Sequence, residues 1–299
     1  MNNPFVIETT DLRKRYDGVD ALRGLTLQVP RGAIYGFMGR NGAGKTTTIK
    51  VLLGMAQRAG GQARVFGLDP GAPDASVEIR RRIGFVSDEK DLYDYMTVAD
   101  MIRFTAPFFP RWRADVEQRY LRTFDLPPDR KVKALSRGMR TKLALLLALS
   151  RGAELLVLDE PTSGLDPAVT EEVLQALVRH VASEEMTVFF SSHQVAEVDQ
   201  IADHITIIDR GRAVVTGPLE DLRENHRRIQ LVFDGPAPAV TFRAAGVVRM
   251  RREGRVLTLL SSAGTARILD EARVLNPVSV DIAPVTLKEI FLETVIAED

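Results

Sequence analysis

The chain has 299 residues, 45% of them apolar, which is enough to bury a substantial core and excludes disorder as its main state. Its 40 Lys and Arg balance its 40 Asp and Glu, which argues against a protein that mainly binds a bare nucleic-acid backbone, where a basic excess is expected. The absence of cysteine excludes disulfides, thiolate zinc sites and thiol nucleophiles, and four histidines leave little room for an imidazole metal centre.

No targeting or membrane-spanning segment is expected from the sequence. The N-terminus carries charge early and lacks an apolar stretch before a small-residue cleavage site. The longest apolar run, residues 143–149, is far shorter than the roughly 20 residues that a membrane helix needs. The sequence therefore predicts a soluble intracellular protein, which needs another chain if it acts at a membrane.

Up to about residue 217, short β-branched runs alternate with longer helical stretches, a pattern typical of an α/β domain with a mixed sheet. The expected strands are 6–8, 25–29, 34–38, 64–66, 83–86, 155–158, 187–190, 204–208 and 213–216. After Asp166, apolar residues recur every four positions, which predicts an amphipathic helix with Asp166 as its N-cap and Pro167 as its first residue.

Beyond Gly217 the pattern changes to a cluster of short strands and a closing helix. The strands are expected at 229–233, 240–242, 247–250 and 256–260, and the helix at 287–296. We therefore divide the chain into a first domain, residues 1–218, and a small α+β domain, residues 219–299. Ile290, Phe291 and Val295 form an apolar stripe that must be buried against this domain's sheet, against the first domain, or against a second copy.

A phosphate-binding loop, G-x-x-x-x-G-K-[ST], lies between an expected strand and an expected helix. Its glycines let successive N–H groups point at phosphate oxygens, and the positive end of the helix reinforces them. Lys45 places an ammonium against the same oxygens, and the Thr46 hydroxyl is the expected Mg²⁺ ligand. The residues expected to bind nucleotide here are Gly39, Asn41, Gly42, Ala43, Gly44, Lys45, Thr46 and Thr47.

A second motif places two carboxylates at the end of a strand. Four apolar residues, 155–158, predict a buried strand that delivers Asp159 and Glu160, and Pro161 then ends the ladder. Adjacent strand residues point to opposite sides, so the two carboxylates can have different roles. Asp159 would reach Mg²⁺, and Glu160 would act as general base toward the attacking water.

A third motif opens a helix that runs to Leu149. Ser136 is its expected N-cap, and Arg137, Arg140 and Lys142 crowd cations onto the positive end, where acidic residues are normally favoured. Such an end suits an anion that arrives from elsewhere.

The stretch from Tyr16 to His193, which contains these motifs, resembles the nucleotide-binding subunit of an ATP-binding cassette (ABC) transporter, and the order of the motifs is that of the family. The short single cassette, the entry strand at 34–38 and the tail at 287–293 are similar to ATPases of bacterial drug and antibiotic exporters. The resemblance implies a P-loop NTPase cassette with a mixed sheet and a helical signature subdomain, followed by the small α+β domain. It also implies that ATP and Mg²⁺ are bound and that ATP is hydrolysed.

The resemblance assigns further roles. Tyr16 would stack on adenine, and Asp166 would communicate between two nucleotide sites in addition to capping its helix. Ser136 and Gly138 would bind the γ-phosphate held by a second cassette in a head-to-tail dimer. His193 would contact the γ-phosphate of its own site.

Two motifs depart from the family pattern. Arg137 and Met139 replace the first glycine and the glutamine of the usual signature Leu-Ser-Gly-Gly-Gln. Asp88 stands where a glutamine usually follows the strand 83–86. A carboxylate at this position can still approach Mg²⁺ but cannot donate an amide hydrogen bond, so Asp88 is a third candidate metal ligand.

The resemblance also implies partners. The aromatic-rich segment 93–112 would carry a groove for a coupling helix of a membrane-spanning permease subunit, although packing within a small helical layer explains part of the same pattern. The chain would then lie in the cytoplasm, peripheral to the inner face of the cell membrane. It would bind two ATP molecules with a second cassette, in a homodimer or a heterodimer.

The main alternative is a soluble ABC-type ATPase that acts on DNA or ribosomes. Such DNA-acting types carry a long coiled coil between the phosphate loop and the signature, but Lys45 and Ser136 are only about 90 positions apart, with no sustained heptads. Translation-type members have two cassettes in one chain, whereas this chain has one phosphate loop. No nucleic-acid partner is therefore expected. A nucleotide-binding regulator without hydrolysis is a further alternative, and it would be expected to lack Glu160.

Overall fold

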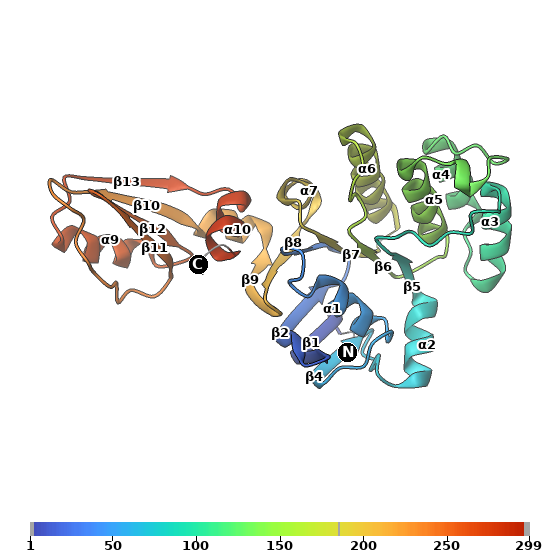
Figure 1. Ribbon diagram of the computed structural model, residues 1–299, viewed down its shortest axis with the longest axis horizontal. Coiled ribbons are helices and arrows are strands. Elements are labelled where there is room, and N and C mark those ends of the chain that lie inside the picture. The colour runs from blue at the N-terminus through green and yellow to red at the C-terminus, as the bar shows by residue number, and fades with distance from the viewer. Residues whose placement is uncertain (1–2, 185, 296–299) are drawn as a thin grey trace. The chain divides into compact units, whose positions relative to one another are not determined.

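The computed structural model describes residues 3–184 and 186–295, and the chain divides into two compact units, Met1–Ala213 and Val214–Asp299 (Figure 1). The division falls inside a strand, a few residues before the boundary that we place at 218 from the sequence. Residue 296, the last of the expected closing helix, lies outside the described residues.

The strands of the first unit form two sheets, and the mixed α/β fold expected from the sequence is confirmed. An antiparallel sheet has the order β2-β1-β4, and a six-stranded sheet has the order β5-β6-β7-β3-β8-β9, in which β5 to β8 pair in parallel. The strands are β1 (Phe5–Tyr16), β2 (Val19–Pro30), β3 (Ile34–Met38), β4 (Gly60–Val65), β5 (Ile83–Val86), β6 (Leu155–Asp159), β7 (Thr187–Ser192), β8 (His204–Asp209) and β9 (Arg212–Pro218).

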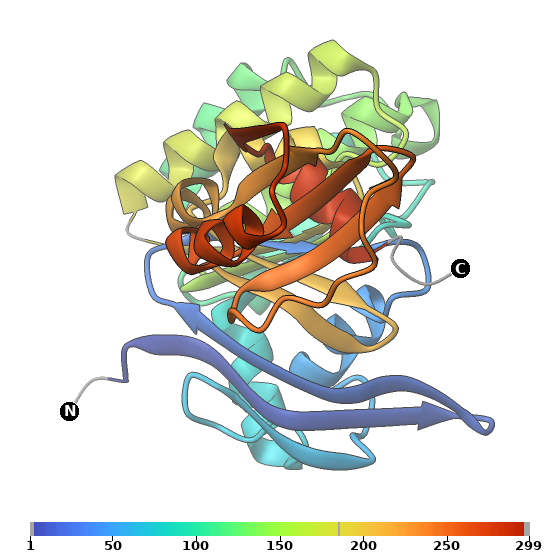
Figure 2. The same cartoon turned by 90° about the vertical axis from the view of Figure 1, so that its left-hand side faces the viewer.

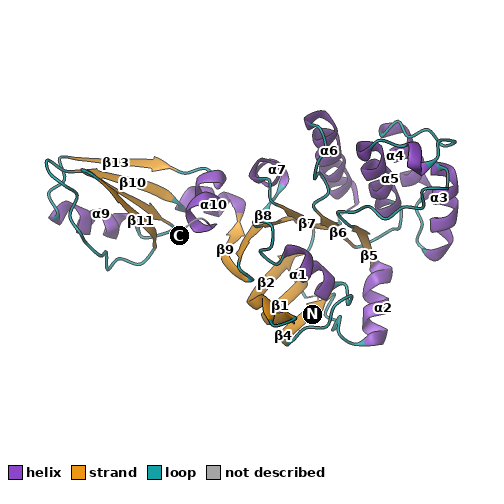
Figure 3. Ribbon diagram, viewed as in Figure 1, coloured by secondary structure: helices purple, strands orange, loops and turns teal. Residues whose placement is uncertain are grey.

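The helices of this unit gather partly into a separate layer. Figure 3 shows α3, α4 and α5 together beyond the β5 edge of the six-stranded sheet, as expected of a helical subdomain. The helices are α1 (Lys45–Leu52), α2 (Pro73–Arg82), α3 (Val98–Thr105), α4 (Ala114–Thr123), α5 (Arg137–Leu149), α6 (Pro167–Glu184) and α7 (Val195–Ile201), with short 3₁₀ turns at Ala106–Phe108 and Val132–Ala134.

The antiparallel strands are much longer than the sequence pattern indicates. Figure 2 shows β1 and β2 as one long hairpin, whereas the sequence predicts only 6–8 and 25–29. One face of this sheet is exposed, so charged residues such as Arg13 and Arg15 alternate with buried ones such as Leu12. Short apolar runs mark only the fully buried part of such strands.

The parallel strands match the expected ranges closely because both of their faces are buried. All five residues of β3 and of β6 are buried, so each strand is a continuous apolar run in the sequence. Within the sheet Asp159 pairs with Ser191, and Met38 pairs with Ser192. The carboxyl ends of β3, β6 and β7 therefore meet at one edge of the sheet, where the phosphate loop, the carboxylates and His193 follow them.

The second unit is a four-stranded antiparallel sheet, in the order β11-β12-β10-β13, with helices on it. The core between the sheet and α9 includes Ile229, Leu231, Leu259 and Ile268. The elements are α8 (Leu219–Asn225), β10 (Arg227–Val232), β11 (Val247–Glu253), β12 (Val256–Ser261), α9 (Thr265–Val274), β13 (Ser279–Pro284) and α10 (Leu287–Val295).

Four details of the second unit differ from the sequence prediction. The strand expected at 240–242 is wrong, because this segment has no strand structure and directly follows a stretch with prolines at 236 and 238. Helices α8 and α9 and strand β13 were not expected. Strand β13 lies at the sheet edge with most of its residues exposed, so it has no apolar run in the sequence.

The apolar stripe of α10 is buried. Ile290, Phe291 and Val295 are each less than a tenth exposed, and ion pairs join Arg228 to Glu289 at 2.8 Å and Arg249 to Glu293 at 2.9 Å. Because both arginines lie on strands of this unit's sheet, α10 packs on that sheet. Of the three alternatives for the stripe, the structure supports burial against its own domain.

Candidate nucleotide site

The phosphate loop follows β3 and leads into α1, in the strand–loop–helix context that the motif requires. Gly44 adopts a left-handed φ of 111°, and a Cβ at this position would lie 2.8 Å from the carbonyl oxygen of Ala21. A Cβ at Gly39 would lie 2.5 Å from the carbonyl oxygen of Ile208. Glycine is therefore required at both positions by the closeness of the neighbouring backbone. Within the loop, the N–H of Ala43 donates to the carbonyl oxygen of Arg40 at 3.1 Å, which closes a tight turn at the tip.

Lys45, at the start of α1, is a buried lysine that lies over the loop. Its Nζ donates to the carbonyl oxygen of Gly39 at 2.7 Å and to that of Arg40 at 3.3 Å, and it pairs with Oε1 of Glu160 at 3.1 Å. The lysine is 6% exposed, so its charge is balanced chiefly by these oxygens. Phosphate oxygens of a bound nucleotide would be alternative partners for the same ammonium.

The two carboxylates at the end of β6 have different surroundings. Asp159 is 4% exposed and its Oδ1 accepts a hydrogen bond of 2.6 Å from the Ser191 hydroxyl. Ser191 Oγ in turn accepts from the backbone N–H of Glu160 at 3.1 Å. One serine on the neighbouring strand thus fixes both carboxylate residues. Sequence reasoning missed Ser191, although its place directly after the strand expected at 187–190 was a usable signal.

Glu160 turns the chain at the end of the strand. It has a left-handed φ of 48°, which turns the side chain away from the strand direction. The carboxylate then lies between Lys45 and His193. Its Oε2 lies 2.7 Å from Nδ1 of His193, which follows β7. The structure therefore brings together Lys45, Glu160 and His193, the three residues that the sequence places at the γ-phosphate.

The loop after β5 reaches the same place. Asp88 is half-exposed and pairs with Lys90 Nζ at 3.7 Å, and Lys90 Nζ donates to the backbone carbonyl of Glu160 at 3.2 Å. Burial lowers the pKa of Lys90, and the charge of Arg137 lowers it further, while Asp88 and Asp159 act in the opposite direction. Sequence reasoning did not single out Lys90.

A hollow of about 650 Å³ lies beside these residues, and Thr46, Asp88 and Asp159 all line it. In the described part of the chain no three carboxylate or imidazole groups cluster closely enough to hold a metal by themselves. The donors fit Mg²⁺ bound jointly by protein and phosphate oxygens, because a hard cation takes few protein ligands and accepts the rest from a nucleotide. Thr46 and Asp159 would hold it, with Asp88 within the same hollow.

Ser136 caps α5, as expected, by accepting a hydrogen bond of 3.2 Å from the backbone N–H of Met139. The expectation of an unpaired cationic helix end is wrong for two of the three cations. Arg140 pairs with Asp94 at 2.8 Å, and Lys142 pairs with Glu172 at 2.6 Å. Carboxylates from other segments offset these charges, which the sequence pattern around the helix start does not reveal.

The remaining cation, Arg137, lies against Gly164, since a Cβ on that glycine would collide with its guanidinium. Across the described residues no ion pair joins Arg137 to a carboxylate. Gly138 packs against Val169 at the start of α6, and Asp166 caps that helix by accepting from the N–H groups of Ala168 and Val169, both at 3.1 Å. The signature and the loop at 163–166 thus form one surface, with the side chain of Ser136 exposed.

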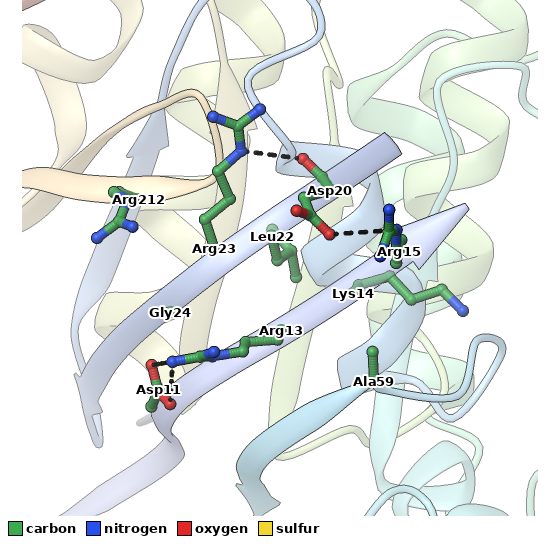
Figure 4. Close-up of a pocket in the computed structure, with 10 residues that line it drawn as sticks. All are labelled: Asp11, Arg13, Lys14, Arg15, Asp20, Leu22, Arg23, Gly24, Ala59 and Arg212. Atoms are coloured by element: carbon green, nitrogen blue, oxygen red, sulfur yellow. Dashed lines mark hydrogen bonds and ion pairs between the residues drawn. The ribbon is translucent and has the colours of Figure 1, made fainter. Parts of the chain in front are cut away.

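Tyr16 ends β1 with its ring 41% exposed, and Lys14 Nζ lies 4.4 Å from the ring centroid. Figure 4 shows a second hollow over β1 and β2, of about 620 Å³, which is lined by Arg15 but not by Tyr16. Asp11 pairs with Arg13 there, and Asp20 pairs with Arg15, so acids offset part of the basic lining. This hollow contains no phosphate-loop residue.

Four aromatic side chains of the segment 93–112 contact one another and are also exposed at the surface. Ring contacts join Tyr93 to Tyr95 at 5.8 Å, Tyr93 to Phe104 at 5.4 Å, and Phe104 to Phe108 at 5.5 Å between centroids. All four side chains are more than 40% exposed, so we call them the exposed aromatic cluster. Surface aromatic groups that touch mainly each other are typical of a site that a partner covers.

Comparison with known proteins adds independent evidence. Residues 22–163 match a family model described as "ABC transporter". The chain is 36% identical to the bacitracin transport ATP-binding protein of Bacillus licheniformis, over 75% of this chain and 73% of that protein. It is 37% identical to the daunorubicin/doxorubicin resistance ATP-binding protein of Streptomyces peucetius, over 73% of this chain and 67% of the other.

A solved structure of the ATP-binding subunit of an ABC transporter superposes with a TM-score of 0.66 at 28% identity, covering 73% of this chain and 92% of that one. The share of this chain that is covered is close to the size of its first unit. None of the helices described here is long and apolar enough to span a membrane.

Proposed function

Since this chain belongs to the ABC transporter family of ATP-binding proteins, we propose that it is the ATP-hydrolysing subunit of an exporter, with a separate membrane-spanning permease as its partner. The observation that carries the proposal is the convergence of Lys45, Glu160 and His193 beside the phosphate loop. The similar proteins named above include a bacitracin transport protein and a daunorubicin/doxorubicin resistance protein, which supports export rather than import.

Each residue has a role in hydrolysis that follows from its chemistry. The loop N–H groups and Lys45 hold the β- and γ-phosphates, and Tyr16 offers its exposed face to adenine. Water attacks the γ-phosphorus, its proton passes to the Glu160 carboxylate, and the bond to the bridging oxygen breaks to release ADP and phosphate. His193, with Nδ1 2.7 Å from Oε2 of Glu160, orients that carboxylate and would contact the γ-phosphate. Mg²⁺, held through Thr46 and Asp159, would offset the phosphate charge.

The proposal includes a dimer that shares its nucleotides. Ser136 is exposed at the positive end of a 13-residue helix, and Arg137 beside it has no carboxylate partner among the described residues. Within one chain Ser136 caps its own helix, and among the described residues no hydrogen bond joins it to the phosphate loop. An anion carried by another cassette would meet Ser136, Gly138 and Arg137 together. Two ATP molecules would then lie between two chains, with Asp166 beside each shared surface.

The exposed aromatic cluster supports the proposed permease partner. It lies in the helical layer, and the hollow that Thr46 and Asp159 line is also lined by apolar residues, among them Met101, Phe109 and Leu147. An amphipathic helix of a partner would bury both the ring faces and this apolar wall. Such a partner would hold the chain at the cytoplasmic face of the membrane.

A soluble ATPase acting on DNA remains the alternative, and the structure argues against it. Between Lys45 and Ser136 every residue is described, and the longest helices there, α2 and α4, have ten residues each. A coiled-coil arm needs several heptads, so this region cannot supply one.

ATP hydrolysis by the purified chain tests the enzymatic part of the proposal. Glu160→Gln should bind ATP normally but hydrolyse it about 10²- to 10⁴-fold more slowly, because an amide cannot take the proton from water. The matched control is Glu171→Gln, an exposed residue on α6 that should leave the rate unchanged. A Glu160→Gln rate within threefold of the parent would remove Glu160 from the role of base.

The partner is tested by co-purification with a membrane protein encoded beside this chain. Tyr95→Ser and Phe108→Ser change side chains that are 69% and 64% exposed, so both variants should keep their thermal midpoint and their basal ATP hydrolysis. We expect both to lose the permease. Undiminished co-purification would show that the permease binds elsewhere.

A further inference from the structure

Lys90 is a buried lysine for which the hydrolysis steps above have no use. It lies in the loop after β5, is 7% exposed, and adopts a left-handed φ of 49°. Burying an ammonium is costly unless it is well paired, and a left-handed backbone is unfavourable for a side chain other than glycine. The surrounding structure therefore holds Lys90 in place against two costs, and its contacts indicate why.

The short contact of Lys90 is to the backbone of the proposed general base. Nζ lies 3.2 Å from the carbonyl oxygen of Glu160, whereas the nearest carboxylate oxygen, on Asp88, is 3.7 Å away. The Glu160 carbonyl also accepts from the N–H of Ser163 at 3.2 Å. The left-handed turn at Glu160 is thus held by one donor within the turn, Ser163, and by one donor from a distant segment, Lys90 in the loop at 87–92.

These contacts matter because the turn aims the Glu160 side chain. The backbone N–H of Glu160 is fixed by Ser191, and its carbonyl is fixed by Lys90, so both sides of the residue are anchored. A general base acts only when its carboxylate lies within hydrogen-bond reach of the water, and small displacements of such groups are costly. An ion pair with Asp88 alone would not explain the geometry, because Asp88 is half-exposed and its contact is the longer one.

We propose that Lys90 is a positioning residue, an inference that rests on the proposed ATPase function. Lys90 anchors the main chain of Glu160 and connects the loop after β5 to the proposed general base. The family pattern places a glutamine two residues earlier, where this chain has Asp88. Here the loop reaches the end of β6 through a lysine ammonium instead of that amide. Movement of the loop would then displace Glu160 directly.

The test compares three variants in steady-state ATP hydrolysis. Lys90→Met keeps the length and apolar stem of the side chain but removes the donor, and it should lower kcat about 10- to 100-fold, the range expected for a lost hydrogen bond to a charged group. KM for ATP should stay within about threefold, since Lys90 does not hold phosphate in this account. Lys90→Arg, which keeps a charged donor, should recover at least part of kcat. Lys131→Met, at an exposed lysine outside the hollow that Lys90 lines, is the matched control.

A double variant separates positioning from a general effect on the fold. If Lys90 acts through Glu160, then Lys90→Met should cause no further loss when Glu160 is already Gln, measured with enzyme in excess over ATP. A Lys90→Met kcat within threefold of the parent, or an equal loss in the Glu160→Gln background, would overturn the proposal.

Two further outcomes are separable. If Lys90→Met does not fold, Lys90→Ala replaces it under the same criteria, because it also removes the donor but places no long apolar side chain in the loop. If the parent chain hydrolyses no ATP, or if Glu160→Gln is fully active, the proposed function fails. If only the Lys90 variants behave as the parent does, the ATPase function stands and the role of Lys90 is wrong.

Discussion

Without nucleotide, the phosphate-loop lysine is paired with the proposed general base, and this pair should contribute measurably to stability. Nζ of Lys45 lies 3.1 Å from Oε1 of Glu160, and the two side chains are only 6% and 11% exposed. Replacing Lys45 with Met removes the cation but leaves the buried carboxylate. The expected result is a less stable protein, even though methionine is a good apolar substitute for the lysine stem.

The size of the loss follows from the contacts that remain. Removing one partner of a buried ion pair typically costs about 3–5 kcal/mol of unfolding free energy, because the other charge is left uncompensated. Glu160 keeps His193 Nδ1 at 2.7 Å from its second oxygen, which offsets part of the penalty. We therefore expect the lower end, about 3 kcal/mol, for Lys45→Met.

Urea unfolding without ATP or Mg²⁺ measures this difference in a double-mutant cycle. Lys45→Met combined with Glu160→Gln should be more stable than Lys45→Met alone, because no charge is then left buried and unpaired. The reasoning is refuted if Lys45→Met lies within about 0.5 kcal/mol of the parent, or if the two losses add to within that margin. If the result is as expected, ATP must compete with Glu160 for Lys45, and binding would release the base for catalysis.

Two predictions concern residues outside the nucleotide site. Deletion after Gly217 should leave the ATP affinity within tenfold of that of the full chain, because every proposed site residue precedes position 194. The deletion should change the thermal midpoint or the assembly. A loss of affinity of tenfold or more in a folded truncation would place part of the site in the tail. Burial lowers the pKa of His180 from 6.5 to about 4, so the unfolded chain binds a proton at this imidazole more tightly than the folded chain does. The free energy of unfolding is therefore at its full value above pH 6.5 and falls as the pH drops toward 4. The loss at pH 5 should be about 2 kcal/mol and should be absent in His180→Phe; an equal loss in that variant would assign the pH dependence to other groups.

The sequence predicted those parts of the fold and of the site that depend on residues close together in the chain. A fully buried parallel strand leads into the phosphate loop, into the carboxylates at the end of β6 and into His193. Each of these sites is therefore marked in the sequence by an apolar run just before it. Ser136 and Asp166 were found as N-caps because capping depends on the first turn of the helix alone.

The missed features depend on contacts between distant segments. Lys90 acquires its role only through the carbonyl of Glu160, 70 positions later in the chain, and Arg140 is neutralised by Asp94 from another loop. The outer parts of β1 and β2 lack apolar runs because they are solvated on one face. Strand β13 lacks one because nearly all of its residues are exposed. No pattern within a short window contains this information.

The central claim is that one ATP is bound by Lys45 of one chain and Ser136 of another. Sedimentation velocity of Glu160→Gln with and without ATP and Mg²⁺ tests it directly, with Ser136→Asp added in the same background. Aspartate caps a helix as well as serine does, so α5 should stay intact, but its charge opposes a phosphate. We predict that ATP converts Glu160→Gln from monomer to dimer and leaves the Ser136→Asp variant monomeric. A Glu160→Gln protein that stays monomeric at saturating ATP, or a Ser136→Asp variant that dimerises equally well, would contradict the account.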